Sequence, residues 1–114
     1  LTALALGVEP EDVLVASTGV TGQPLPMGLI RAGIRQIALS AEGGHDLARA
    51  IMTTDTVPKE TAAVVRGDVR FTIGGIAKGA GMIHPNMATL LSVIATDAKV
   101  SPALLDRALR AAVN

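Results

Sequence analysis

The chain has 114 residues, no cysteine, and ten basic against ten acidic side chains, so its formal net charge is zero. This balance offers no general attraction to nucleic acid or to an anionic membrane, and the lack of cysteine excludes disulfides, thiolate zinc sites and cysteine nucleophiles. The longest apolar runs are far shorter than the ~18–20 residues that a membrane span needs. We therefore expect neither a nucleic-acid partner nor a membrane partner, and chemistry that uses oxygen or nitrogen atoms.

The composition is richer in apolar residues than that of an ordinary domain. Apolar residues make up 49% of the sequence before its 12 glycines are added, whereas about 45–50% is usual with glycine included. The sequence starts at Leu1 in what reads as the tail of a helix and stops at Asn114 inside another helical pattern. We interpret it as an incomplete fragment of a single catalytic domain, whose apolar faces pack on chain outside it.

The first half of the sequence predicts one strand and two helices. Val13–Ser17 is a short apolar run that leads into a glycine-rich turn, which is typical of a buried strand ending at a site. Apolar residues then recur every three or four positions in Met27–Ile37, which predicts a helix with one apolar stripe. A second helix follows Gly43–Gly44 and ends at the polar cluster Thr53–Thr56.

The second half predicts a hairpin, a third strand and a last helix. Ala63–Val65 and Val69–Ile73 flank Arg66–Asp68, where glycine and aspartate indicate a hairpin turn rather than an adhesion tripeptide. Thr89–Thr96 supplies another strand, and Ser101 then N-caps a helix whose leucine stripe should be buried. Elements in this order predict an α/β layered sandwich, with helices packed on a mixed β-sheet.

Thr89 follows a small residue, Ala88, and opens a strand. Its hydroxyl can attack the Ala88 carbonyl and break the chain through an ester intermediate, which leaves Thr89 as a new amino terminus. A free α-amine has a pKa of ~7.7–8.0, so it can accept the hydroxyl proton when Thr89 acts as a nucleophile. The alternative is a structural threonine, because β-branched residues favour strands.

Five short segments carry a family resemblance and keep their order and spacing between about Leu14 and Asp97. They are Ser17–Val20, Leu25–Met27, Ile51–Thr56, Gly74–Gly79 and Pro85–Thr89. Together they resemble the ornithine acetyltransferases, a bifunctional arginine-biosynthesis family that makes N-acetylglutamate. Several linked motifs are a specific indication, whereas any one alone would be weak. The resemblance implies the α/β fold of DmpA and the ornithine acetyltransferases.

The resemblance also implies a precursor that cleaves itself between Ala88 and Thr89. Residues 1–88 would then be the end of the α subunit and residues 89–114 the start of the β subunit, and the two would assemble as a heterotetramer. Thr89 would take acetyl from N-acetylornithine and pass it to glutamate by a ping-pong mechanism. The cycle needs no cofactor, although some members also use acetyl-CoA as a substrate. The family's location is the cytoplasm, or the mitochondrion in fungi.

Further site residues follow from the same resemblance. Thr18 and Gly19 match the oxyanion-hole pair, since a hydroxyl and a backbone N–H can stabilise a tetrahedral oxyanion; a plain glycine turn is the alternative. Lys78 matches a substrate-binding lysine that pairs with a carboxylate, although alone it would be a surface lysine. Either Thr53 or Thr54 would contact substrate, and otherwise both simply end the helix.

Other readings remain beside this one. A related self-processing aminopeptidase would use the same nucleophile but transfer the acyl group to water, and a non-enzymatic protein would keep Thr89 as a core residue. We expect no metal site, because His45 and His84 lack a ligand-spaced acidic partner. Thr21 and Gly28–Leu29 depart from the family pattern, and the family's remaining pocket residues lie outside the sequence, so the fragment alone should be inactive.

Overall fold

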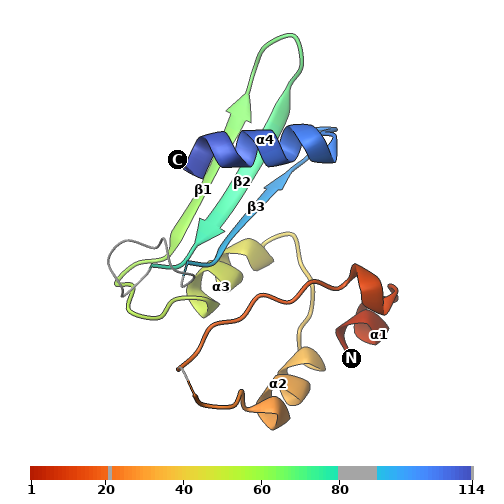
Figure 1. The fold of residues 1–114 in the computed structure, drawn as a ribbon, viewed down its shortest axis with the longest axis vertical. Coiled ribbons are helices and arrows are strands. Elements are labelled where there is room, and N and C mark those ends of the chain that lie inside the picture. The colour runs from red at the N-terminus through yellow and green to blue at the C-terminus, as the bar shows by residue number, and fades with distance from the viewer. Residues whose placement is uncertain (21, 80–89, 114) are drawn as a thin grey trace.

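The computed structural model describes residues 1–20, 22–79 and 90–113, which form short helices and one three-stranded sheet (Figure 1). The predicted α/β class is confirmed at this level. In chain order the elements are α1 (Thr2–Leu6), the 3-10 helix η1 (Pro10–Asp12), α2 (Met27–Ile34), α3 (Gly43–Ala50), β1 (Lys59–Val65), β2 (Phe71–Ala77), β3 (Ser92–Thr96) and α4 (Pro102–Val113).

The sheet has the order β1-β2-β3, and both pairings are antiparallel. The mixed sheet that the sequence predicted is therefore wrong for the described strands. The predicted hairpin is confirmed: Val65 pairs with Phe71, so residues 66–70 form the connecting loop, and Val69 and Arg70 belong to this loop rather than to β2. A connection this short joins only antiparallel neighbours, because a parallel pair needs a crossover of a dozen or more residues.

Side-chain hydrogen bonds reinforce the pairing of β2 with β3. The Ser92 hydroxyl donates to the carbonyl oxygen of Ile76 over 3.1 Å, and the Thr96 hydroxyl donates to the carbonyl oxygen of Thr72 over 2.7 Å. The Thr72 N–H donates to the Asp97 carboxylate over 2.6 Å. These bonds hold both ends of β3 against the central strand. The predicted third strand is confirmed over Ser92–Thr96, but Leu90 and Leu91, which were predicted to belong to it, are not part of the strand.

The helix predictions are confirmed with shorter bounds. The stripe expected over residues 27–37 gives a helix that ends at Ile34, and the helix expected after the paired glycines begins at Gly43. Ser101 caps α4 as predicted, since its hydroxyl oxygen accepts the Leu104 N–H at 3.3 Å. The N-terminal helix tail is α1, and the residue that follows it, Gly7, caps it in the left-handed conformation, with φ +69°.

The strand predicted over Val13–Ser17 is wrong. These residues form no strand, and Leu14 is 93% exposed. A strand requires a neighbouring backbone to satisfy its N–H and C=O groups, and no described segment pairs with this one. The run is apolar enough for a buried strand, but among the described residues no strand pairs with it and no other element packs over it.

Much of the apolar surface is open. The chain exposes 9825 Å², whereas a compact monomer of this mass exposes roughly 5,800 Å²; its radius of gyration is 16.2 Å, against about 13 Å for a compact domain. Helix α3 contacts β1 and β2, while α4 crosses in front of the sheet without comparable contacts (Figure 1). The α4 stripe predicted to be buried is about half exposed at Leu104, Leu105 and Leu109.

Candidate functional site

Asp55 lies in the loop between α3 and β1 and receives donors from three parts of the chain. Its Oδ2 accepts the backbone N–H of Thr53 at 3.2 Å, and its Oδ1 accepts the backbone N–H of Gly79 at 2.6 Å. The Lys59 ammonium forms an ion pair with the same Oδ1. The Asp55 side chain is only 1% exposed. One buried carboxylate therefore joins the end of α3, the start of β1 and the chain that follows β2.

Gly79 allows this close approach because it has no side chain. A Cβ at this position would lie 3.1 Å from the Cγ of Asp55 and closer still to Oδ1, well inside van der Waals contact. The φ angle of Gly79 is not in the left-handed region, so space rather than backbone conformation requires glycine here. The close approach of the Asp55 carboxylate thus explains why position 79 is a glycine.

The surroundings of Asp55 favour its ionised form. The Lys59 hydrogen bond is the largest cause, and together with the Thr53 and Gly79 N–H groups it lowers the pKa of the Asp55 carboxyl to about 2. Desolvation by burial acts in the opposite direction but is outweighed. At neutral pH the carboxylate is fully charged and acts only as an acceptor, which suits its three donors.

Lys78 directly follows β2 and is 4% exposed. Its backbone N–H donates to the carbonyl oxygen of Leu91 at 3.0 Å, so the pairing of β2 with the segment before β3 continues one step beyond the strand. The next N–H along the chain, that of Gly79, is held by Asp55. The main chain at Lys78 is therefore held on both sides. It is the 4% exposure that contradicts the alternative of an ordinary surface lysine.

Thr53 and Thr54 lie in the same loop as Asp55, and both residues are exposed. The Thr53 N–H bond to Asp55 brings this loop to the chain that carries Lys78. The loop that holds both candidate threonines and the chain that carries Lys78 are therefore joined through one carboxylate. A loop that presents exposed hydroxyls beside a buried lysine can offer both hydrogen bonds and a positive charge to a small anionic ligand.

The predicted oxyanion-hole pair is not brought to this cluster. Thr18 and Gly19 are exposed in the segment before α2, and within residues 1–20, 22–79 and 90–113 no hydrogen bond or ion pair links them to Thr53, Thr54 or Asp55. Downstream, Gly22 has φ +80° in a turn closed by the Gln23 N–H on the carbonyl oxygen of Val20, at 3.1 Å.

The predicted cleavage site, Ala88 and Thr89, lies outside the described residues, as does His84. Leu91 is the nearest described residue in the sequence whose backbone has a hydrogen-bond partner: its carbonyl oxygen accepts the Lys78 N–H. Leu91 is two residues after Thr89 in the sequence. The proposed nucleophile thus belongs to the chain segment that connects Lys78–Gly79 to Leu91.

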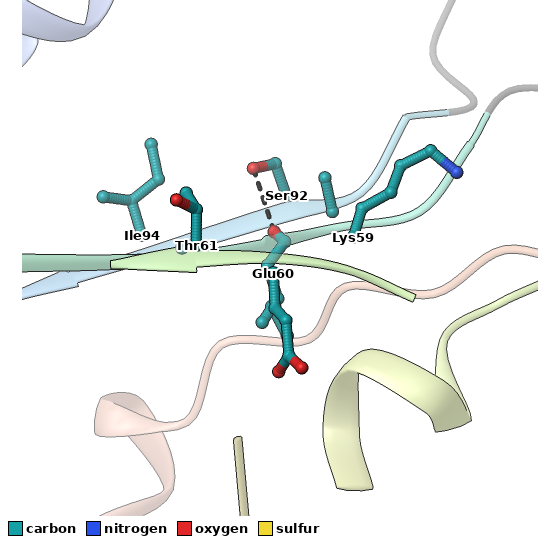
Figure 2. Close-up of a pocket in the computed structure, with 8 residues that line it drawn as sticks. Lys59, Glu60, Thr61, Ser92 and Ile94 are labelled. Atoms are coloured by element: carbon teal, nitrogen blue, oxygen red, sulfur yellow. Dashed lines mark hydrogen bonds between the residues drawn. The ribbon is translucent and has the colours of Figure 1, made fainter. Parts of the chain in front are cut away.

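Two hollows lie on opposite faces of the sheet. The first, of about 350 Å³, is open above the side chains of Lys59, Thr61, Ser92 and Ile94, which project from one face, whereas Glu60 points the other way (Figure 2). The second, of about 620 Å³, lies between α3 and the sheet. On that side His45 Nδ1 lies 2.7 Å from Glu60 Oε2, which ties α3 to β1. His45 thus has acidic neighbours in Glu60 and, at 4.0 Å, Glu42, whereas no such partner was expected from the sequence.

Sequence reasoning missed Asp55, Lys59 and Gly79 as parts of the site. Asp55 was recognised only as a member of a polar cluster that ends a helix and of one family segment, Ile51–Thr56, with no role of its own. An aspartate just after a helix does indicate a local backbone acceptor, which the Thr53 bond confirms. Its second backbone partner is 24 residues away, and a single sequence carries no indication of such a pair. In the part of the chain that the structure describes, no three metal-ligating side chains converge and no helix has the length and apolarity of a membrane span.

Comparison with known proteins shows the family to which the sequence is similar. The family model described as "ArgJ family" matches residues 1–114. The arginine biosynthesis bifunctional protein ArgJ of Symbiobacterium thermophilum is 58% identical over 100% of this chain and 29% of its own length. The proteins of the same name from Dehalococcoides mccartyi and a Synechococcus strain are 54% and 55% identical over 99% and 98% of this chain, and 28% of their own lengths.

The chain belongs to the ArgJ family, because the family model matches it from end to end. It spans less than a third of the length of the curated relatives it matches. The resemblance found in the five sequence segments is thereby confirmed, and the fragment interpretation agrees with this coverage.

Proposed function

We propose that this ArgJ-family chain is part of a self-processing acetyltransferase that moves acetyl from N-acetylornithine to glutamate in arginine biosynthesis. The observation that carries the proposal is the match of the whole chain, at 58% identity, to a relative named arginine biosynthesis bifunctional protein. The activity is proposed for the whole protein, of which this chain holds the cleavage site and part of the substrate site.

The first step is maturation. The Thr89 hydroxyl attacks the carbonyl carbon of Ala88, the C–N bond between them breaks, and the acyl group rests on the threonine oxygen as an ester. Water then hydrolyses the ester, which frees the Ala88 carboxylate and leaves Thr89 with both its hydroxyl and a free α-amine. Residues 1–88 become the end of an α subunit and residues 89–114 the start of a β subunit, and the two subunits stay together in a heterotetramer.

Acetyl transfer then proceeds in two half-reactions. The Thr89 α-amine accepts the hydroxyl proton as the oxygen attacks the acetyl carbonyl of N-acetylornithine. The Thr18 hydroxyl and the Gly19 N–H stabilise the tetrahedral oxyanion. Its collapse breaks the amide C–N bond, ornithine leaves with the proton, and acetyl remains on Thr89. Glutamate's amine then attacks the ester and departs as N-acetylglutamate, which restores the free hydroxyl.

Substrate binding is assigned to the cluster around Asp55. Lys78 is nearly buried and its main chain is fixed, so its ammonium can pair with a substrate carboxylate at little cost in side-chain entropy. A hydroxyl from Thr53 or Thr54 supplies a hydrogen bond from the loop that the same cluster holds. No cofactor is required by this cycle, and acetyl-CoA enters as an alternative acetyl donor. We expect the protein in the cytoplasm, or in the mitochondrion if its source is a fungus.

The test is a transfer assay with the full-length protein, N-acetylornithine labelled in its acetyl group, and glutamate. The proposal predicts that labelled N-acetylglutamate and free ornithine form in a one-to-one ratio. The control is the strand variant Thr61→Ala, which should give the same yield as the parent protein. Labelled acetate without N-acetylglutamate would mean that water is the acceptor, and would replace the transferase by the hydrolase alternative. No release of ornithine would contradict both enzymes.

A further inference from the structure

Asp55 is placed to do more than end a helix. A local cap needs only a neighbouring backbone N–H, and the Thr53 N–H, two residues away, satisfies that need. The carboxylate also reaches the Gly79 N–H, 24 residues along the chain, through the shorter of the two bonds, 2.6 Å against 3.2 Å. A glycine is present where any side chain would collide with this carboxylate. Helix termination alone therefore does not explain the bond between Asp55 and Gly79.

The bond also joins the two segments to which substrate contacts are assigned. Lys78 precedes Gly79 directly, and Thr54 lies between Thr53 and Asp55 itself. The Lys78 N–H is fixed from the other direction by Leu91. With Asp55 bonded, the lysine and the threonine loop keep one relative arrangement. Without it, the described hydrogen bond that ties the Thr53–Thr54 loop to Gly79 is lost.

We propose that Asp55 is a positioning residue, whose carboxylate holds Lys78–Gly79 and the Thr53–Thr54 loop together so that both meet one substrate. This inference rests on the proposed function for the identity of the substrate, but not for the contact itself. Asp55 is bonded to protein groups on both of its oxygens and does not act on the reacting atoms. Loss of the carboxylate should therefore weaken substrate binding more than it slows the chemical step.

Lys59 offers a matched comparison within the same cluster. It pairs with Asp55 but is 47% exposed, and it takes part in neither backbone bond. Lys59→Met removes the ion pair and leaves both N–H bonds to the carboxylate possible. Asp55→Asn keeps the size of the side chain but presents an amide N–H₂ where one of the two backbone donors needs an acceptor. Comparing the two variants separates the effect of the backbone hydrogen bonds to Asp55 from the effect of its ion pair with Lys59.

The experiment uses the full-length protein with Asp55→Asn, Lys59→Met and, as a remote carboxylate control, Asp106→Asn, which loses only an exposed pair with Arg110. Amide exchange at Gly79 is measured first, because it needs no activity. We expect Asp55→Asn to speed this exchange by roughly tenfold or more, as for loss of a hydrogen bond to a charged group. Lys59→Met should speed it by less than Asp55→Asn does, because both N–H bonds to the carboxylate remain possible. Asp106→Asn should stay within about twofold of the parent, in keeping with the small contribution of an exposed ion pair.

Steady-state kinetics with N-acetylornithine follow on the same proteins. We expect Asp55→Asn to raise KM by roughly tenfold with a smaller change in kcat. Lys59→Met should raise KM by less than Asp55→Asn does, and the remote control Asp106→Asn should leave both KM and kcat nearly unchanged. If Asp55→Asn does not fold, Gly79→Ala takes its place, because it displaces the same contact and keeps the charge. Unchanged exchange at Gly79, or unchanged KM in a folded variant, would overturn the positioning role while the parent's activity still stood. If the parent protein transfers no acetyl group but Asp55→Asn still speeds amide exchange at Gly79, the proposed function is overturned and the contact between Asp55 and Gly79 stands.

Discussion

The Gly79 backbone N–H donates to the buried Asp55 carboxylate over 2.6 Å, although the two residues are 24 positions apart in the sequence. This bond brings the exit of the central strand to the loop that follows α3. The chain that carries Lys78 and the loop that carries Thr53 and Thr54, whose roles were inferred from the family resemblance, are thereby joined through one acceptor.

Gly79→Ala should destabilise the full-length protein by about 1–3 kcal/mol, the usual cost of forcing a methyl group into filled space. The added Cβ would lie 3.1 Å from the Asp55 Cγ, so either the carboxylate or the strand exit must move. The free energy of unfolding from denaturant titration measures the effect. Gly67→Ala is the control, because its Cβ would meet nothing within 4 Å. Equal stability of the two variants would contradict the close contact.

The stabilising effect of Asp55 should disappear in acid. Its pKa is about 2 in the folded chain, below the ordinary 3.8, so between these values the unfolded state binds more protons than the folded state. The contribution is therefore complete above about pH 4 and is lost as the pH falls towards about 2. Denaturant unfolding of the parent and of Asp55→Asn should give stabilities that converge across this window. A difference that stays constant from about pH 5 to about pH 2 would show that the charge is not responsible.

Lys78→Met should lower kcat/KM for N-acetylornithine by roughly ten- to a hundredfold, since a buried charge-assisted contact with a substrate carboxylate would be lost. Lys99→Met, at an exposed lysine after β3, is the matched control and should change little. Steady-state kinetics on the full-length variants give the comparison. Similar values for the two variants would remove Lys78 from the substrate site.

Ser101→Ala should destabilise the full-length protein by about 0.5–2 kcal/mol, because the Ser101 hydroxyl oxygen accepts the Leu104 N–H at the start of α4. Ser101→Thr retains a hydroxyl at the cap and should recover most of the loss. Thermal unfolding of both variants compares them. If the alanine and threonine variants melt together below the parent, the cap bond is not the cause.

Local patterns predicted most of the secondary structure because the physics that forms it is local. Spacing of apolar residues located α2, the Ser101 cap located α4, and the loop at Arg66–Asp68 located the hairpin. The strand predicted over Val13–Ser17 was wrong because a strand depends on a partner elsewhere in the chain. The same limit hid the bond from Asp55 to Gly79. Motif resemblance named Lys78 and the threonines, but only the folded backbone showed what brings them together.

The most direct test of the central claim is the intact mass, under denaturing conditions, of the full-length protein and of its Thr89→Ala variant. We predict two pieces that join at Ala88 and Thr89 for the parent, and a single uncleaved chain for the variant. One uncleaved mass for the properly folded parent would contradict the self-processing mechanism and return Thr89 to a structural role.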